Sequence, residues 1–263
     1  MIDTHCHLLP GIDDGPQDVE AAVAMARVAC QDGIKTIVVT PHMREGDYLN
    51  ERPKILDALA YMRVQLQLAG VALELEAGSE VHLGPRMVER IEQGRLLTYA
   101  DQRRYLLLEC PYRSPPVGLE KAVFELKVAG ITPVLAHPER IRFFLEEPAR
   151  YEEALRLGAL GQLTSSSLLG TFGPTIQRVS EDWVRRGMVH LLASDAHDAD
   201  YRPPRLAKAR ERWAELAGEE SATRAAMEWP EALLRGDPIT PEPPLSRERR
   251  PPGLLRRLFG GRP

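Results

Sequence analysis

Two short motifs place pairs of metal-binding side chains two residues apart: His5-x-His7 near the N-terminus and Asp195-x-His197 toward the C-terminus. Residues i and i+2 of an extended segment point to the same side, so each pair can present both side chains to one ion. A single pair is a weak signal, because an isolated histidine at a strand end is usually a hydrogen-bonded structural residue. The case for a metal therefore depends on where the other histidines and carboxylates fall.

The chain alternates short apolar runs with helical segments, which predicts a parallel sheet. For example, IKTIVVT at residues 34–40 has the β-branched composition of a buried strand, and Asp18 is a plausible N-cap for the helix before it. The expected strands are residues 1–6, 34–40, 72–77, 105–110, 132–137, 160–164 and 189–194. The expected helices are residues 18–32, 53–69, 85–93, 119–129, 148–157, 175–186, 204–216 and 220–234. Because no glycine-rich phosphate loop follows the first strand, we expect an α/β fold closed into a barrel rather than an open sheet.

The ionisable candidates fall at the carboxyl ends of these strands. In a parallel barrel those ends meet at one mouth, where active sites are built. Burying five of the seven histidines there together with three carboxylates would be costly without a metal. Six of the seven expected strands contribute at least one candidate, and the full set is His5, His7, His42, Glu80, Glu109, His137, Asp195 and His197.

The types of these side chains narrow the chemistry. Imidazole and carboxylate donors without a thiolate suit Mn, Fe, Zn or Co in a catalytic site that keeps open positions. The number of candidates predicts more than one ion, and multinuclear sites of this kind serve hydrolysis at phosphorus.

The composition limits the alternatives. A chain of 263 residues with 43% hydrophobic content can build one large barrel with a real core. The net charge of -4 leaves no basic stripe, so no nucleic-acid partner is expected. The cysteines Cys6, Cys30 and Cys110 are odd in number and widely spaced, as in a reducing compartment. No apolar run approaches the ~20 residues of a membrane span, and we therefore expect a cytoplasmic protein without a transmembrane segment.

The composition shifts to Pro, Arg and Gly near the C-terminus. Residues 236–263 carry six Arg against Asp237, Glu242 and Glu248, a balance of +3 (6 − 3). We expect a barrel domain at residues 1–237 and a disordered tail at residues 238–263. The stretch GLLRRLFGG in this tail has the pattern of a short basic amphipathic turn in weak contact with an anionic membrane; a solvated end is the simpler interpretation.

The chain resembles the PHP superfamily of metal-dependent phosphoesterases, and more narrowly its bacterial protein-tyrosine phosphatases of capsule and exopolysaccharide biosynthesis. The resemblance runs from residue 1 to about residue 234 and rests on the ordered motifs DTHCHLLPGIDDGP, TPHMR, GSEVHL, LLLEC, AHPER and SDAHD. It implies a distorted seven-stranded (β/α) barrel of the PHP type that holds three divalent metal ions, with manganese expected.

The resemblance also implies roles for individual residues. The nine implied metal ligands are the eight candidates above and Asp14, which strand spacing alone does not place. Asp13 is the rival of Asp14, which is favoured. Arg140 in HPER and Arg202 in YRPP match arginines that hold the substrate phosphate, to which a guanidinium can bind in a bidentate manner.

Three other polar residues receive expectations of their own. Asp3 is expected to orient a ligand imidazole from behind. His82 is interpreted as a wall residue of the site and His190 as a structural histidine.

These observations predict a metal-dependent phosphotyrosine-protein phosphatase. By resemblance, its substrate would be the tyrosine-rich tail of a membrane-associated tyrosine kinase that controls polysaccharide synthesis. A cysteine nucleophile is excluded, because the three cysteines have Ile12, Thr36 and Pro116 where a Cys-x5-Arg loop requires Arg. The alternatives are a PHP phosphatase of small molecules such as histidinol phosphate, a PHP nuclease, and a barrel kept only as a binding module.

Overall fold

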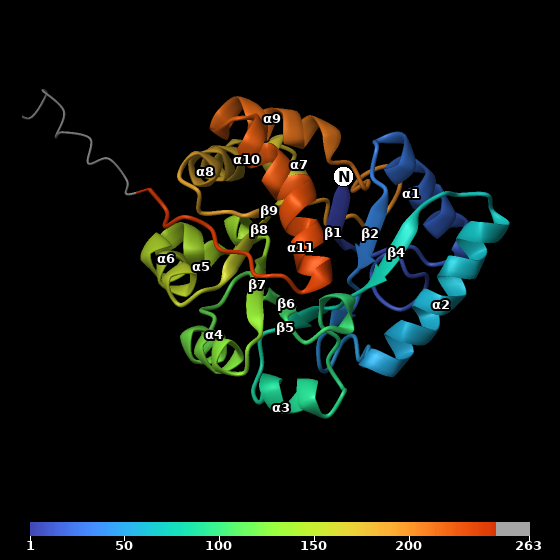
Figure 1. The fold of residues 1–263 in the computed structure, drawn as a ribbon, viewed down its shortest axis with the longest axis horizontal. Coiled ribbons are helices and arrows are strands. Elements are labelled where there is room, and N and C mark those ends of the chain that lie inside the picture. The colour runs from blue at the N-terminus through green and yellow to red at the C-terminus, as the bar shows by residue number, and fades with distance from the viewer. Residues whose placement is uncertain (246–263) are drawn as a thin grey trace, which may run out of the picture.

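The computed structural model describes residues 1–245, which form parallel strands surrounded by helices (Figure 1). The strands are β1 Ile2–Cys6, β2 Thr36–Val39, β3 His42–Met43, β4 Glu74–Ala77, β5 Glu80–His82, β6 Tyr105–Glu109, β7 Thr132–Ala136, β8 Leu160–Thr164 and β9 Leu191–Ala193. The main helices are α1 Val19–Gln31, α2 Arg52–Leu68, α3 Met87–Glu92, α4 Leu119–Val128, α6 Pro148–Arg156, α8 Pro174–Arg185, α9 Ala207–Ala217 and α11 Trp229–Arg235. Shorter helices and turns are η1 Tyr99–Asp101, η2 Pro138–Arg140, α5 Arg142–Glu146, α7 Ser165–Leu168, α10 Glu219–Thr223 and η3 Arg224–Glu228.

The parallel α/β fold expected from the sequence is confirmed, and each expected strand is present. The strands are hydrogen-bonded in two sheets, ordered β1-β2-β4 and β3-β5-β6-β7-β8-β9. A parallel bridge between Cys6 and Ala196 connects the end of β1 to the segment after β9. The sequence did not predict the short strands β3 and β5, which follow β2 and β4 after a break of two residues each.

Pro41 and Gly78 lie at these breaks. Pro41 lies between β2 and β3 and has no backbone N–H to donate to a sheet. Gly78 lies between β4 and β5, where an added Cβ would be only 2.9 Å from Val38 Cγ1 and so too close to tolerate. Pairing resumes at His42 and Glu80, which are matched across β3 and β5. The breaks place both side chains at the site described below.

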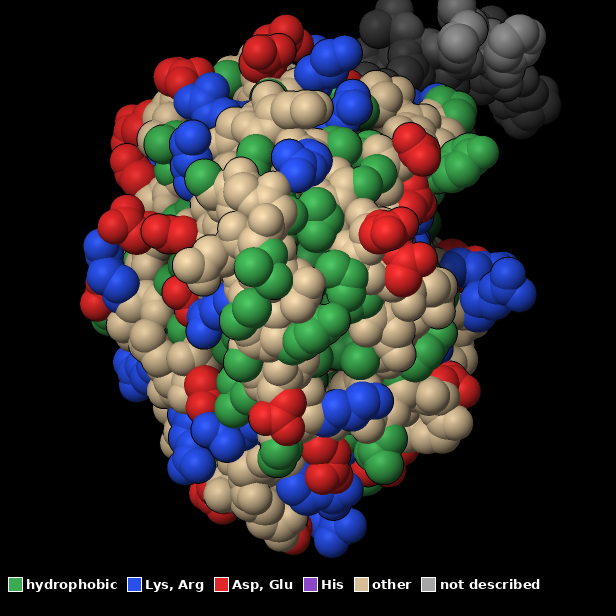
Figure 2. All heavy atoms as spheres, turned by 90° about the vertical axis from the view of Figure 1, so that its right-hand side faces the viewer, with side chains coloured by type: hydrophobic (Ala, Val, Ile, Leu, Met, Phe, Trp, Pro, Cys, Tyr) green, Lys and Arg blue, Asp and Glu red, His purple; other side chains and the backbone are tan. Residues whose placement is uncertain are grey.

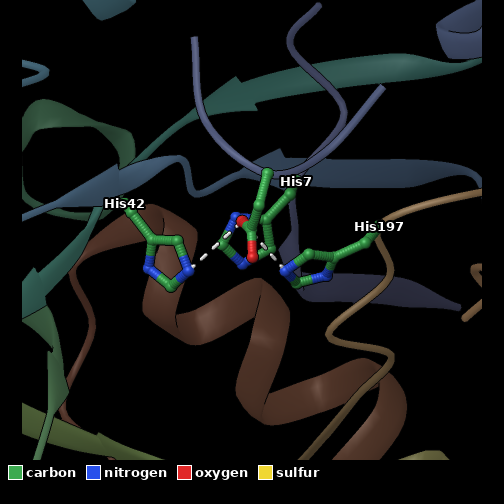
Figure 3. Close-up of side chains that lie close together, drawn as sticks. His7, His42 and His197 are labelled. Carbon is green, nitrogen blue, oxygen red and sulfur yellow. Dashed lines mark ion pairs between the residues drawn. The ribbon is translucent and has the colours of Figure 1, made fainter. Parts of the chain in front are cut away.

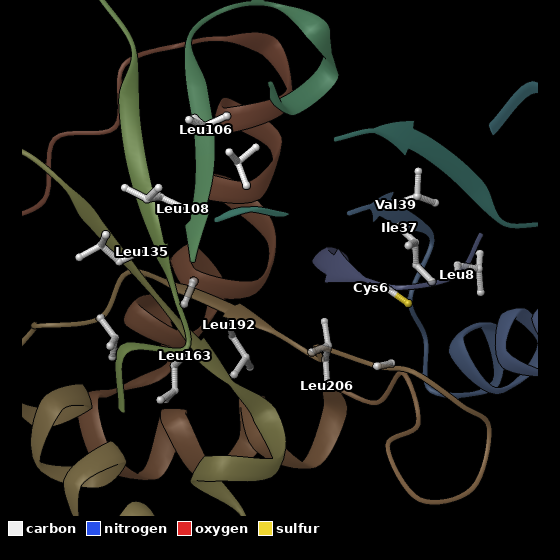
Figure 4. Packing of buried hydrophobic residues seen from close by; sticks show 14 of the residues in the cluster. Cys6, Leu8, Ile37, Val39, Leu106, Leu108, Leu135, Leu163, Leu192 and Leu206 are labelled. Carbon is white, nitrogen blue, oxygen red and sulfur yellow. The ribbon is translucent and has the colours of Figure 1, made fainter. Parts of the chain in front are cut away.

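Alternate residues of the strands pack on opposite sides. Leu106 and Leu108 of β6 face outward to the helices, and Tyr105 and Leu107 belong to a smaller inner cluster. Figure 4 shows residues of the outer cluster, among them Ile37 and Val39 of β2, Leu108 of β6 and Leu135 of β7. Most of the apolar core thus lies between the strands and the helices.

The inner cluster is covered by α11 and the residues after it. Leu233 of α11 and Ile239 pack against Tyr105 and Leu107, and the Tyr105 hydroxyl donates to the carbonyl of Asp237. The predicted boundary between barrel and tail at residue 238 stays a prediction, but Ile239 is buried in the body. The rest of the predicted tail from residue 246 onward, including GLLRRLFGG, lies outside the described residues.

The surface carries charges of both signs. On the side of the molecule that faces right in Figure 1, where α1 and α2 lie, Lys and Arg alternate with Asp and Glu around apolar side chains (Figure 2). Within residues 1–245, none of the helices has the length and apolar character needed to cross a bilayer.

Candidate metal centre

The strand ends deliver the predicted metal-binding side chains to one place. His5 lies in β1, His42 and Glu80 begin β3 and β5, and Glu109 ends β6. His137 directly follows β7, and Asp195 lies two residues after the end of β9. Both have positive φ angles, 34° for His137 and 52° for Asp195. Such backbone conformations are strained for residues other than glycine and cluster at functional sites.

One group surrounds Asp14. Its Oδ1 lies 3.4 Å from His42 Nε2 and 3.3 Å from His197 Nε2. Figure 3 shows the rings of His7, His42 and His197 turned toward a common point, with dashed lines marking the ion pairs of His42 and His197. Ligand atoms of these three histidines and Asp14 all lie within 4.8 Å of one another, which fits one metal ion.

A second group surrounds the buried carboxylate of Glu80. Its Oε2 lies 3.4 Å from His5 Nε2, 3.5 Å from His7 Nε2 and 2.8 Å from His42 Nδ1. Its other oxygen lies 2.9 Å from His137 Nε2. Glu80 thus contacts four histidines from three different strand ends, as a carboxylate that bridges two ions would.

Two buried polar atoms of this cluster lack a hydrogen-bond partner among the described residues. Glu80 Oε2 and His42 Nδ1 are buried, yet neither makes a hydrogen bond of acceptable geometry to any described residue. Leaving such groups unpaired in a protein interior is costly. Glu80 Oε2 and His42 Nδ1 lie 2.8 Å apart, and a metal ion bound to both would satisfy them. The imidazole and carboxylate side chains of the cluster therefore fit bound divalent metals.

The other two predicted carboxylates join the same cluster. Glu109 forms a possible ligand group with His42 and Glu80, and its Oε2 is also 3.2 Å from His82 Nδ1. Asp195 Oδ1 lies 3.4 Å from His5 Nε2 and 3.6 Å from His7 Nε2. All nine predicted ligands therefore lie in one connected cluster.

Asp13 and Asp14 differ in what their carboxylates contact. Asp13 is buried, and its oxygens accept from His7 Nδ1 at 2.7 Å and from the backbone N–H groups of Gly15 and His42, both at 3.0 Å. These contacts leave Asp13 behind His7, where it fixes the imidazole with Nε2 toward the cluster. The Asp14 side chain remains 46% exposed and points into the cluster itself.

The expectation for Asp3 was wrong. Its carboxylate accepts hydrogen bonds from the Ser194 hydroxyl and backbone and from the backbone N–H of His5, and does not contact the His5 ring. Gln162 of β8 orients that ring instead, with Oε1 2.8 Å from His5 Nδ1. The Gln162 amide is held in turn by Thr4 and Tyr99.

His82 and His190 lie in different places. His82 is partly exposed beside Glu109, at the edge of the site. His190 is buried away from the cluster, and its Nδ1 accepts a hydrogen bond from the backbone N–H of Gly161.

Two arginines converge on the same oxygen of Asp195. Arg140 Nη1 lies 2.5 Å and Arg202 Nη2 lies 2.8 Å from Asp195 Oδ2. The guanidinium of Arg140 also stacks between two aromatic rings, 5.3 Å from the centroid of Tyr112 and 4.4 Å from that of Phe172. Both arginines are thereby held with donors toward the cluster.

A pocket of about 210 Å³ opens above the cluster. The lining residues are Asp14, His42, Arg44, Glu109, Tyr112, His137, Arg140, Asp195, His197 and Arg202.

The electrostatics of the cluster keep its carboxylates ionised. Burial alone would raise the pKa of Glu80, but the charges of His5 and His42 hold it well below its usual range. Burial opposes ionisation of Asp195 too, and its pKa is lowered by His5, His7 and the two arginines. For Asp14, burial is opposed by the hydrogen bond to His197 and by the charges of His197, His42 and His7, which together lower the pKa. Carboxylates kept in the anionic form are the state that binds divalent cations.

Several site residues were missed by the sequence reasoning. Gln162, Tyr112 and Phe172 come from segments far apart in the chain, and none of them stands in a motif that signals its role. Tyr112 stacks on the His137 ring at 5.1 Å and places its hydroxyl 3.1 Å from His137 Nε2. Arg44 follows the TPH motif and could have been proposed as a third basic residue at the pocket.

Comparisons with known proteins agree with this geometry. A family model described as capsular polysaccharide synthesis, CpsB/CapC, matches residues 1–235. The tyrosine-protein phosphatase YwqE of Bacillus subtilis is 34% identical over 260 residues, which cover 99% of each chain. The tyrosine-protein phosphatase CpsB of Streptococcus pneumoniae is 27% identical over 239 residues, 89% of this chain and 98% of the relative.

Two solved structures are similar to this chain. One, described as YwqE from Bacillus subtilis and CpsB from Streptococcus pneumoniae, unique metal-dependent tyrosine phosphatases, matches with a TM-score of 0.90 and 34% identity over 95% of this chain and 100% of the solved chain. The lactonase Lmo2620 of Listeria monocytogenes matches with a TM-score of 0.53 at 10% identity, over 89% of this chain and 94% of the other, and so shares the fold alone.

Proposed function

This chain belongs to the CpsB/CapC family of capsular polysaccharide synthesis proteins, and we propose that it is a metal-dependent tyrosine-protein phosphatase. The observation that carries the proposal is the convergence of nine imidazole and carboxylate side chains in one cluster, six of which line a small pocket together with two arginines. The imidazole and carboxylate side chains suit divalent metals, and the two arginines suit a phosphate dianion.

We propose that three divalent ions, with manganese favoured over iron, zinc or cobalt, are held by the cluster. The ligands are His5, His7, Asp14, His42, Glu80, Glu109, His137, Asp195 and His197, and Asp14 is preferred to Asp13 because the Asp13 oxygens are already used by His7 and two backbone N–H groups. When bound, such ions supply Lewis acidity and lower the pKa of water at the site.

The roles of the protein side chains follow from their positions. Arg140 and Arg202 present guanidinium donors to the pocket and would bind the phosphate oxygens of the substrate, where negative charge develops as the ester bond breaks. Asp195 holds both guanidinium groups in place. Asp13 and Gln162 keep His7 and His5 in the tautomers that leave Nε2 free to bind an ion.

The finer predictions about context are proposals that rest on the family. We propose that the natural substrate is a phosphorylated tyrosine kinase associated with the membrane and with capsule or exopolysaccharide synthesis, and that the reaction takes place in the cytoplasm. We also propose that the two sheets together correspond to the distorted seven-stranded PHP barrel. In that description β2 with β3, and β4 with β5, each count as one interrupted strand.

The experiment that tests the function is phosphate release by the purified protein, with added Mn²⁺, from a phosphotyrosine peptide and from histidinol phosphate in parallel. The variants are His5→Ala for the metal cluster and Arg140→Ala for the phosphate contact. His190→Asn is the control, since His190 is a buried histidine away from the cluster.

We expect the peptide to be preferred, and its cleavage to be lost in His5→Ala and Arg140→Ala but retained in His190→Asn. Preference for histidinol phosphate would move the chain to the small-molecule branch with the same metal chemistry. Cleavage of neither substrate with any divalent metal would refute the phosphatase proposal.

A further inference from the structure

An apolar groove of about 840 Å³ lies between α3 and α4, outside the metal centre. These two helices are neighbours at the lower edge of Figure 1. The groove is lined by apolar side chains of both helices and of the loops that precede them. Three of these side chains are far more exposed than is usual for their type: Val117 at 88%, Phe124 at 60% and Val128 at 72%.

Helix α4 therefore has two apolar faces. Leu119, Ala122, Val123 and Leu126 are buried against the strands, as in any amphipathic helix on a sheet. Phe124 and Val128 are four residues apart and lie on another face together, with no described residue covering them. A second apolar face on a helix that already packs into the core indicates a binding surface.

The upper end of the groove lies next to residues of the metal centre. At its upper end, Leu83 follows His82, whose Nδ1 is 3.2 Å from the Glu109 carboxylate. The backbone N–H of Leu83 also donates to the Glu109 carbonyl at 2.8 Å. On the other side, the loop between β6 and α4 carries Tyr112 in the pocket wall and Val117 in the groove.

We propose that this groove binds the peptide segment next to the phosphotyrosine of a protein substrate, through an aliphatic or aromatic side chain placed on Phe124 and Val128. The proposal rests on the proposed phosphatase function. A phosphorylated side chain in the pocket would bring its flanking residues to the upper end of the groove, because the loop between β6 and α4 lines both and Leu83 of the groove is hydrogen-bonded to Glu109 of the pocket.

The dimensions and charges of the groove agree with such an occupant. The ten residues of α4 rise ~15 Å at ~1.5 Å per residue, a length that about five extended residues at ~3.3 Å each would span. The charged residues at the rim are paired, with Arg86 3.8 Å from Glu89 and Lys121 3.7 Å from Glu125. With these charges balanced, apolar side chains determine what binds.

The test compares two sets of phosphotyrosine peptides, one with Leu and Phe on both flanks and one with Ser and Asn in their place. The variant is Phe124→Ser with Val128→Ser. Its matched control is Tyr61→Ser with Leu68→Ser, which removes an aromatic and an aliphatic side chain of similar exposure, 52% and 77%, from the C-terminal half of α2. Substrates are turned over with Mn²⁺, and p-nitrophenyl phosphate, which has no flanking residues, is run beside them.

We expect wild type and the α2 control to prefer the apolar-flanked peptides by about tenfold in kcat/KM, a factor that corresponds to ~1.4 kcal/mol. The α4 variant should lose this preference, mainly through a higher KM, and keep wild-type activity on p-nitrophenyl phosphate. No preference in wild type, or a preference that survives in the α4 variant, would overturn the proposal. A change of oligomeric state in that variant with the preference intact would instead assign the groove to a second copy of the chain.

A binding measurement separates this proposal from the phosphatase proposal. Fluorescence anisotropy follows the same peptides carrying a non-hydrolysable phosphonate in place of the phosphate. If wild type hydrolyses nothing, the phosphatase function fails, but the apolar-flanked phosphonate should still bind wild type more tightly than the α4 variant. Equal binding to both proteins would refute the groove, whatever the activity.

Discussion

Replacing Asp13 by Asn should weaken metal binding, although Asp13 is not one of the proposed ligands. Both oxygens of Asp13 accept hydrogen bonds, one from Gly15 N–H and the other from His7 Nδ1 and His42 N–H. An Asn of the same shape has only one accepting oxygen. With its NH₂ group at the Oδ1 position, the Asn would face the Gly15 N–H, which is also a donor. With its NH₂ group at the Oδ2 position, it would face the His42 N–H and force His7 to carry its proton on Nε2, the atom that points at the cluster.

The size of the effect follows from the contact that is lost. The 2.7 Å hydrogen bond between His7 Nδ1 and Asp13 Oδ2 is buried and charge-assisted, and such a bond is worth ~1.5–3 kcal/mol. At ~1.4 kcal/mol per factor of ten, metal affinity should fall roughly 10- to 100-fold. This agrees with the ~10- to 100-fold loss usual for removing the partner of a metal-binding histidine.

The assay is calorimetric titration of the chelator-treated protein with Mn²⁺, supported by the Mn²⁺ dependence of phosphate release. Asp32→Asn is the control, because Asp32 Oδ2 accepts from the backbone N–H groups of Leu206 and Ala207 at 2.6 and 2.8 Å and lies outside the cluster. Both variants should lose stability, but only Asp13→Asn should need more Mn²⁺ and recover activity when it is supplied. Unchanged affinity in Asp13→Asn, or an equal loss in Asp32→Asn, would refute the orienting role.

Three further changes test other parts of the structure. Arg140→Lys should lower kcat/KM for a phosphotyrosine peptide ~100-fold in steady-state assays. The reason is that an ammonium group cannot hold phosphate in a bidentate manner or stack on aromatic rings as a guanidinium does. Wild-type kinetics in this variant would exclude the phosphate contact. Burial lowers the pKa of His190 to about 4 from 6.5, so the unfolded state takes up the proton first and stability should fall by ~3 kcal/mol between pH 6.5 and 4. Urea unfolding should show that His190→Asn flattens this slope, and an unchanged slope would place the acid sensitivity elsewhere. Gly15→Ala puts a Cβ 2.4 Å from the His7 carbonyl and should cost ~1–3 kcal/mol in the same measurement, whereas Gly84→Ala, with its nearest contact at 3.7 Å, should be nearly neutral.

The strand-end ligands could be predicted because their positions depend on local rules. Alternation along an extended segment fixes that His5 and His7 share a side, and parallel strands bring their carboxyl ends to one mouth. Glu80, Glu109 and His137 therefore followed from the strand assignment alone. The sequence by itself thus determined the fold class, the donor types of the candidate metal site and most of its candidate ligands.

What the tertiary structure decided is how side chains from separate segments meet. Asp13 and Asp14 are neighbours in one loop, and only the loop conformation turns the first behind His7 and the second into the cluster. Gln162, rather than Asp3, orients His5. Gln162 lies on β8 and His5 on β1, and these strands are far apart in the chain, so only the folded structure shows that the two side chains meet. Spacing fixes directions within a strand, whereas contacts between segments depend on how the strands and loops pack.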